Sequence, residues 1–371
     1  MKITLDQGTL LRELSLLQGI IERKATLPIL ANVLLSATDD GRLAITATDL
    51  EIGFRSSVPA TVETPGTLTV HARRLHDIIR RLPPGNLGFR FADGSLHITC
   101  ERIRYRLATQ DSEQFPSLRQ KEGQPALRVD AAALADMIKR VLFAITADDP
   151  RYYIGGALWE LGEEALTIVG TDGNRLALSR RAVHQSEEGT TRLVIPRKAV
   201  SELLKLASDY DGDVFIWHSS NSLHAQMGER ELSTSLQEQK FPDYNRVIPD
   251  GNDKSVILET ALFRSAIERV AVLSQEHTHL VKLDLEAGLI RFSSSHQQLG
   301  EAQEELPLEY TGDPFSIGFN GQYLLDFLGV AGSEKVELSL GQSMGQGLLE
   351  PVRDSEDQRE DVYIVMPMAL S

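Results

Sequence analysis

The feature that most constrains this chain is an internal repeat of about 125 residues, present three times along its 371 residues. Each third opens on an amphipathic helical pattern, beginning near Leu10, Leu134 and Leu262. Each third also closes on an apolar residue, a proline and one further side chain, as Phe115-Pro116-Ser117, Phe241-Pro242-Asp243 and Met366-Pro367-Met368. The prolines lie 126 and 125 residues apart. Matches in one order and at one spacing predict a triplicated domain.

Two further motifs follow the same spacing. A second helix begins at His71-Ala72-Arg73-Arg74-Leu75, and its pattern recurs at Ile195-Pro196-Arg197-Lys198-Ala199 and Phe319-Asn320-Gly321-Gln322-Tyr323. Thr48-Asp49-Leu50 and Thr171-Asp172-Gly173 lie 123 residues apart, each after an apolar run. We therefore expect domains at 1–122, 123–250 and 251–371, with polar linkers at 120–124 and 249–254.

Between the helical patterns lie short runs that alternate apolar and polar residues, such as 41–47, 95–100 and 165–169. Period-two alternation predicts antiparallel strands with one buried face. Asp40-Gly41 and Asp93-Gly94 are strong hairpin signals. Each third is therefore expected to be α+β, with two helices packed on antiparallel sheets.

Charge is distributed unevenly between helices and the rest of the chain. The chain carries −15 overall, whereas its six expected helices sum to +5, so the remainder carries −20; these helices are expected at 8–24, 70–82, 130–140, 194–206, 259–272 and 318–331. Helices on one side of the molecule would make that side basic and able to meet phosphate without reading bases. From charge alone, ordinary helix solvation explains the pattern equally well. The adjacent pairs Arg73-Arg74 and Arg80-Arg81 favour the basic face.

Sequence motifs of catalysis are not found. The chain has no glycine-rich phosphate loop, no His-Glu-x-x-His and no nucleophile elbow. Its single cysteine, Cys100, excludes internal disulfides and cysteine zinc cages, and is expected to be a buried strand residue. His277 and His279 are better explained as solvated, and Asp148-Asp149 as a turn. We expect no metal or cofactor.

No signal peptide and no apolar run of about 20 residues are found, which predicts a cytoplasmic protein without membrane association.

An ordered set of motifs across essentially the whole chain resembles the bacterial β sliding clamp family, the beta subunit of DNA polymerase III. The motifs are Thr26–Leu30, Thr46–Glu51, Arg151–Tyr153, Thr171–Leu176, Val194–Lys198, Phe241–Tyr244, Gly318–Asn320 and Tyr363–Met368. The resemblance implies three repeated DNA-clamp domains and a head-to-tail homodimer forming a ring. Such a ring is a processivity factor: it encircles double-stranded DNA without sequence specificity, and is a non-catalytic accessory subunit of a DNA-directed DNA polymerase (nucleotidyltransferase) holoenzyme.

The resemblance also implies three groups of site residues. Residues expected to face DNA are Lys24, Arg73, Arg74, Tyr152, Tyr153, Arg197 and Lys198. A subunit interface is expected at Arg74, Tyr105, Leu107 and Leu273. A pocket for partner peptides is expected at Ile154, Gly173, Asn174, Arg175, Leu176, Pro242, Arg246, Val247, Asn320, Tyr323, Met344, Ile364, Val365, Met366, Pro367 and Met368. The implied partners are the replicative polymerase catalytic subunit, the clamp loader, repair polymerases and mismatch-repair proteins.

Three features depart from the family pattern. The loop Ala147–Pro150 carries two carboxylates where phosphate would approach, Ala369 replaces a basic residue, and the acidic stretch Glu350–Asp361 is long. Two other functions stay open on the residues alone. One is a peptide-binding hub of the same fold that does not load on DNA, and the other is a metal-dependent nucleic-acid enzyme using Asp148 and Asp149.

Overall fold

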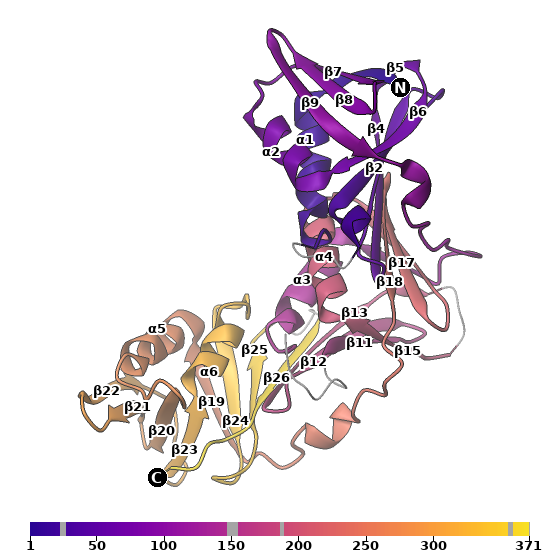
Figure 1. Ribbon diagram of the computed structural model, residues 1–371. Helices are drawn as coiled ribbons and strands as arrows, with labels where there is room; N and C mark the ends of the chain where they lie inside the picture. Colours follow the sequence, from indigo (N-terminus) through magenta and orange to yellow (C-terminus); the bar gives the residue numbers. More distant parts are fainter. Residues whose placement is uncertain (23–26, 147–154, 186–188, 355–358, 371) are drawn as a thin grey trace. The chain divides into compact units, whose positions relative to one another are not determined.

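The structure, a computed structural model, describes residues 1–22, 27–146, 155–185, 189–354 and 359–370 (Figure 1). Its contacts divide the chain into two compact units. Unit 1 comprises Met1–Ala135 with Ser201–Gln237, and unit 2 comprises Asp136–Val200 with Glu238–Ser371. Within the described residues, no helix has the length and apolar character needed to span a membrane.

The described part of the chain has six α-helices, two for each repeat. They are α1 (Gln7–Leu16), α2 (Ala72–Arg81), α3 (Ala131–Leu142), α4 (Arg197–Ser208), α5 (Thr260–Ala271) and α6 (Gly321–Leu328), and short 3₁₀ turns lie at Leu17–Gly19, Pro28–Ala31, Ser112–Gln114 and Tyr244–Val247. The six predicted helices are confirmed, but the second helix of each repeat starts later than predicted. The residues before it, such as Val70 and Val194, complete a strand instead.

Unit 1 is built on one long antiparallel sheet. Its strand order is β10-β16-β17-β18-β4-β3-β2-β6-β9-β8-β7-β1-β5 (Figure 1). The strands are β1 (Lys2–Asp6), β2 (Asn32–Thr38), β3 (Arg42–Thr48), β4 (Ile52–Pro59), β5 (Thr61–Thr64), β6 (Gly66–His71), β7 (Asn86–Ala92), β8 (Ser95–Cys100), β9 (Ile103–Gln110), β10 (Leu127–Asp130), β16 (Asp213–His218), β17 (Ser222–Met227) and β18 (Arg230–Ser235).

Unit 2 contains two antiparallel sheets, ordered β15-β11-β12-β13-β26-β25-β24-β19 and β22-β21-β20-β23. The strands of these sheets are β11 (Gly156–Leu161), β12 (Ala165–Thr171), β13 (Arg175–Ala182), β15 (Thr191–Pro196), β19 (Lys254–Glu259), β20 (Leu280–Glu286), β21 (Leu289–His296), β22 (Gly300–Pro307), β23 (Phe315–Asn320), β24 (Lys335–Leu340), β25 (Gly347–Pro351) and β26 (Glu360–Val365), and the short β14 (His184–Gln185) belongs to neither sheet. The α+β class with helices and antiparallel sheets in each repeat is confirmed.

Both predicted hairpins are present. Gly41 has a φ of 78° between β2 and β3. Asp93 and Gly94 have φ values of 51° and 63° between β7 and β8, and two consecutive positive φ angles are typical of a type I′ turn. Cys100 lies at the end of β8 and is buried, as predicted.

Neighbouring repeats are joined by strand pairing. In unit 1, β4 of the first repeat pairs with β18 of the second, with Gly53 opposite Ser233. In unit 2, β13 of the second repeat pairs with β26 of the third, with Leu176 opposite Ile364. The two pairings, which we call junctions, use corresponding strands of each repeat. The sheet therefore continues from one repeat into the next.

The turn beside each junction is also repeated. Thr48 Oγ1 donates to Ile52 O over 2.8 Å, and Thr171 Oγ1 donates to Arg175 O over 2.6 Å. The middle of the turn requires a positive φ, which is 80° at Leu50 and 88° at Gly173. Glycine adopts this conformation without strain, whereas a bulky side chain does not. The second copy of the turn thus has no side chain where the first has a leucine.

Candidate functional site

A small cavity of about 210 Å³ opens beside the junction in unit 2. It is lined by the β12–β13 turn, by the segment that precedes β19, and by the end of β26. The lining residues are Thr171, Gly173, Arg175, Leu176, Phe241, Pro242, Asp243, Tyr244, Val247, Ile364 and Met366. Leu176, Tyr244 and Ile364 belong to the buried cluster beneath it, against which Phe241 and Val247 pack. The cavity is therefore an apolar opening in the core of unit 2.

The turn that forms one wall is fixed by side-chain hydrogen bonds. Asp172 Oδ1 accepts from the backbone N–H groups of Asn174 and Arg175, over 3.0 and 3.1 Å. Thr171 Oγ1 accepts from Gly173 N over 3.1 Å. Asn174 O in turn accepts from Met366 N over 2.9 Å, which ties the end of β26 to the turn. The wall is preorganised because its backbone groups are satisfied locally.

Arg175 forms a second, charged wall. Its Nε donates to Asp172 Oδ2 over 2.9 Å, its Nη1 to Asp326 Oδ2 over 2.6 Å, and its Nη2 to Phe143 O over 2.7 Å. The guanidinium also lies 4.3 Å from the centre of the Tyr323 ring. With two carboxylates bound and only 10% of its side chain exposed, Arg175 is held in one position. It shapes the cavity and presents little uncompensated charge to a ligand.

Tyr244 closes the floor of the cavity from the 3₁₀ turn Tyr244–Val247. Its hydroxyl donates to Glu160, which also pairs with Arg192 over 2.5 Å. Burial, together with the hydrogen bond to Glu160, raises the pKa of Tyr244 to about 12. The phenol therefore stays neutral and hydrogen-bonded at physiological pH, and its ring contributes apolar surface.

The structure brings together seven of the residues expected in the pocket, namely Gly173, Arg175, Leu176, Pro242, Val247, Ile364 and Met366. Asn174 and Tyr323 contact this wall through Met366 and Arg175, as described above. Asn320 caps α6 by accepting from Gln322 N, and the exposed Arg246 pairs with Asp243.

Other expected pocket residues do not line the cavity. Val365 is fully buried, and strand alternation places it on the opposite face of β26 from Ile364 and Met366. Met344 is 68% exposed and also lies outside the lining. Pro367 and Met368 also lie outside the lining. The Met368 backbone N–H donates to Gly318 O over 2.8 Å, and Met368 lines a different cavity. Ile154 lies outside the described residues.

The lining contains four residues that were not predicted, namely Thr171, Phe241, Asp243 and Tyr244. Three of them belong to the repeat motifs Thr171-Asp172-Gly173 and Phe241-Pro242-Asp243, so the sequence does single them out. The sequence does not show that the two motifs lie side by side at one cavity.

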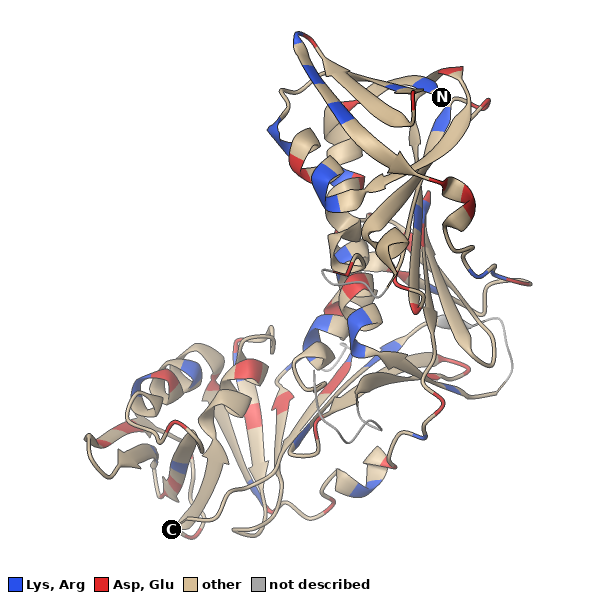
Figure 2. Cartoon of the chain, in the orientation of Figure 1, with Lys and Arg blue, Asp and Glu red and all other residues tan. Residues whose placement is uncertain are grey.

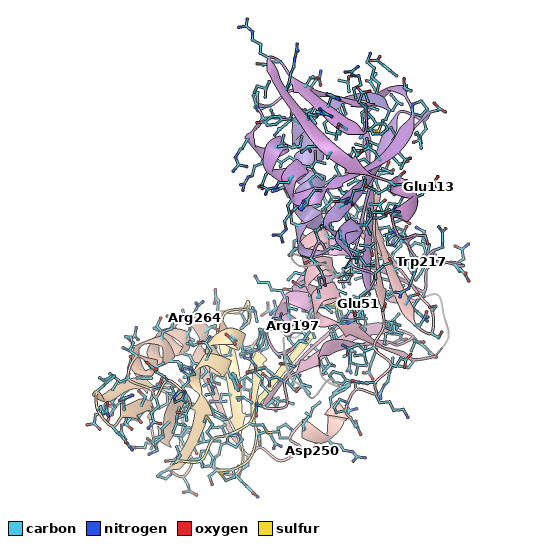
Figure 3. All side chains as sticks on the ribbon, viewed as in Figure 1. Glu51, Glu113, Arg197, Trp217, Asp250 and Arg264 are labelled. Carbon is cyan, nitrogen blue, oxygen red and sulfur yellow. The ribbon has the colours of Figure 1, made fainter. Side chains whose placement is uncertain are left out.

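Residues expected to face DNA are found on the second helices. Arg73 and Arg74 lie on α2, and Arg197 and Lys198 begin α4, where Figure 2 shows basic segments. Arg197, labelled in Figure 3, donates from Nε to Ile145 O over 2.9 Å. The Arg73 Nε is buried with no hydrogen-bond partner among the described residues. Lys24, Tyr152, Tyr153 and the Asp148-Asp149 loop lie outside them.

The residues expected at a subunit interface are accessible. Arg74 is exposed on α2, Tyr105 is 37% exposed on β9, and Leu107 is half-buried on the same strand. Leu273 follows α5 and is half-buried. Among the described residues, no three His, Cys, Asp or Glu side chains are arranged to hold a metal.

Comparisons with known proteins place this geometry in a family. Models of the DNA polymerase III beta subunit match at residues 1–119 (N-terminal domain), 128–243 (central domain) and 245–369 (C-terminal domain). The chain is 36% identical to the beta sliding clamp of Pseudomonas putida and 33% to that of Escherichia coli, in both cases over all of both chains.

Solved structures agree with the sequence relatives. The DNA polymerase III beta subunit of Pseudomonas aeruginosa has a TM-score of 0.92 at 36% identity, with both chains fully covered. The sliding clamp of Bacillus subtilis has a TM-score of 0.94 at 25% identity, also with full coverage. Three clamp domains of this kind define a polymerase processivity factor, a non-catalytic accessory subunit of the replicative holoenzyme. The chain belongs to the DNA polymerase III beta subunit family, that of the beta sliding clamps.

Proposed function

We propose that two copies of this chain, each with clamp domains at 1–122, 123–250 and 251–371, close head to tail into a ring around double-stranded DNA. The observation that carries this proposal is the pairing rule of the junctions. Each internal junction pairs a fourth-position strand, β4 or β13, with the last strand of the next repeat, β18 or β26. The corresponding strands that remain are β22, at the edge of its sheet, and β9, whose Ile103–Ala108 stretch pairs on one side only. Joining them repeats the rule between subunits.

The rule also specifies a register. Thr48, Thr171 and Ser295 are the seventh residues of β3, β12 and β21, and they pair with Gly53, Leu176 and Glu301. Ser95-Leu96-His97 matches Ser222-Leu223-His224, so Arg106 takes the place of Ser233.

Because Gly53 faces Ser233, Glu301 would face Arg106 of the partner subunit. Tyr105 would then lie opposite Ala302, and Leu107 opposite Gly300. Within the described residues, Glu301 and Arg106 form no ion pair, and Arg106 Nε donates to the neutral Ser95 Oγ over 3.0 Å, so both charges are available for this contact. Opposite charges that face each other across a strand pair favour this register over registers shifted along the strands.

We propose that DNA passes beside α2 and α4, where Arg73, Arg74, Arg197 and Lys198 supply positive charge. Closure around the duplex replaces tight binding, so a few phosphate contacts are sufficient and sliding stays possible. The overall charge of −15 supports this view, because a strongly basic protein would hold DNA in place instead. Because the bacterial chromosome lies in the cytoplasm, a protein that encircles it is expected there too.

The cavity beside β13 and β26 is proposed to bind short apolar segments of the replicative polymerase catalytic subunit, the clamp loader, repair polymerases and mismatch-repair proteins. Its apolar lining and small volume suit one or two side chains of an extended peptide. The thioether of Met366 adapts to differently shaped apolar side chains. A clamp of Pseudomonas aeruginosa has been crystallised with griselimycin bound.

Topological retention tests the ring directly. The protein is loaded by a clamp loader onto nicked circular DNA, and the complex is isolated by gel filtration. Retention on the circle and loss after linearisation are expected, and blocking both ends of the linear DNA should restore retention. Equal retention on circular and open linear DNA would show contact binding in place of encirclement.

A further inference from the structure

Each internal junction contains an arginine that reaches from the first helix of one repeat to the end of the second helix of the next. In unit 1, Arg12 on α1 donates from Nη2 to Asp209 O and from Nε to Asp209 Oδ2, both over 2.8 Å. Asp209 is the residue immediately after α4. The guanidinium therefore neutralises a helix C-terminus, where carbonyls have no partner within the helix and the helix dipole is negative.

Unit 2 contains a similar contact, made by an arginine one turn further along the first helix of its repeat. Arg140 on α3 donates from Nη1 to Val330 O over 2.8 Å and to Ala331 O over 2.6 Å, just beyond the end of α6 at Leu328. Asp136 and Asp361 hold its Nε, at 2.9 and 3.3 Å. In unit 2, an arginine that is held by a carboxylate of its own helix thus caps a helix of the next repeat.

The third repeat has an arginine at the position of Arg140. α3 buries Leu134, Met137, Ile138 and Val141, and α5 buries Phe263, Ala266, Ile267 and Val270 at the same spacing. Superposing these patterns places Arg269 on Arg140. Arg269 forms a two-pronged ion pair with Glu304, with 2.7 Å from Nε to Oε2, and its side chain remains 58% exposed. Its Nη1 has no partner in the part of the chain that the structure describes.

A second observation marks the same face of α5. Val272, three residues after Arg269, is 76% exposed, which is unusual for a valine beside a packed helix. Its counterpart Phe143, three residues after Arg140, packs at 5.5 Å from the Tyr363 ring across the junction in unit 2. Among the described residues, the face of α5 that carries Arg269 and Val272 thus lacks the neighbour that α3 has.

We propose that Arg269 caps the C-terminal end of α2 of the partner subunit and so locks the ring at the seam between subunits. Asp77, Glu202 and Asp326 are each the sixth residue of their helix, which aligns α2, α4 and α6. The carbonyls of Arg81 and Leu82 then correspond to those of Val330 and Ala331. The Glu304 carboxylate orients the Arg269 guanidinium. Its negative charge also reduces the electrostatic repulsion between Arg269 and the basic C-terminal end of α2. This inference rests on the proposed ring.

The test compares Arg269→Gln with Arg264→Gln in the full-length protein. Arg264, labelled on α5 in Figure 3, is 50% exposed and pairs with Glu268, but it corresponds to Ala135, off the capping face. Energy transfer between donor-labelled and acceptor-labelled clamps, measured at equilibrium over a dilution series, gives the dimer dissociation constant. Arg269→Gln is expected to raise it by about tenfold or more, since hydrogen bonds to charged groups contribute on this scale. Arg264→Gln is expected to change it by less than about twofold.

The controls separate this proposal from the ring itself. Arg269→Lys keeps the positive charge but loses the several N–H donors of the planar guanidinium. Its dimer dissociation constant should therefore fall between those of the wild type and Arg269→Gln. Circular dichroism checks that each variant is folded. A wild-type protein that is monomeric at micromolar concentration would refute the ring and the lock together. A dimeric wild type whose dissociation constant is matched by both Arg269 variants would overturn the lock alone.

Discussion

Replacing Asp361 by Asn should destabilise unit 2 far more than any change at the neighbouring surface residue. Asp361 is 5% exposed on β26 and binds Arg181 through both oxygens, at 2.9 and 3.0 Å. It also contacts Arg140 and Arg353 and accepts from Ser179 over 2.6 Å. The network joins α3, β13 and the approach to β26, so it supports the junction beneath the cavity.

The magnitude follows from the charges involved. Arg140, Arg181 and Arg353 are largely buried and all contact Asp361, so Asp361→Asn removes the carboxylate that these three guanidinium groups share. Removing one partner of a buried ion pair costs about 3–5 kcal/mol, because the remaining charge stays desolvated. For a unit of this size that corresponds to a melting temperature lower by roughly 6–20 °C.

The matched control is the adjacent residue on the same strand. Glu360 pairs with Arg180 over 2.8 Å, but the two side chains are 46% and 42% exposed. Glu360→Gln should therefore cost less than about 1 kcal/mol. Differential scanning calorimetry of the two variants and the wild type measures both effects. The reasoning fails if Asp361→Asn and Glu360→Gln shift the transition of unit 2 by the same small amount.

Three further predictions address the interface, the cavity and the pH dependence. Arg106→Glu should weaken the dimer by about 1 kcal/mol or more, and combining it with Glu301→Arg should restore it in analytical ultracentrifugation; failure of the double variant to recover would contradict the register. Ile364→Glu should abolish binding of a partner peptide in a fluorescence-polarisation titration, while Leu299→Glu, on an exposed loop, should bind normally. Burial raises the pKa of the Asp361 carboxyl, but hydrogen bonds from Arg181 and Ser179 outweigh it and hold that pKa below its usual 3.8. The stabilisation is thus complete above the unfolded pKa and lost as pH falls through the folded pKa, so in acid titrations the free energy of unfolding of the wild type should fall more steeply over this range than that of Asp361→Asn.

The sequence was sufficient for the repeat and for most local structure. Helices were predictable because each buries residues at helical spacing, and Asp93-Gly94 specified its hairpin because few other residues adopt two positive φ angles. The second helices were placed too early because Val70 and Val194 continue an apolar run that reads equally well as helix or strand. Only strand pairing, a long-range interaction, decides between the two.

The cavity was predictable only in part. Gly173, Leu176 and Ile364 were indicated by family resemblance, but the position of Arg175 depends on Asp326 and Phe143, which are distant in sequence. Tyr244 was missed because its ring is placed by the hydrogen bond to Glu160, and no local pattern signals that contact. Val365 does not line the cavity because it lies on the opposite face of β26 from Ile364, and the register of β26 was not available from the sequence alone.

Strand pairing at the two internal junctions has a mechanical consequence. Four residue pairs join β4 to β18 and six join β13 to β26, so pulling either junction apart breaks several backbone hydrogen bonds at once. Under tension, each junction should therefore resist separation until these hydrogen bonds break together. In the ring proposed above, the contact between subunits lacks the covalent connection that the internal junctions have, so that contact is where we expect the ring to open.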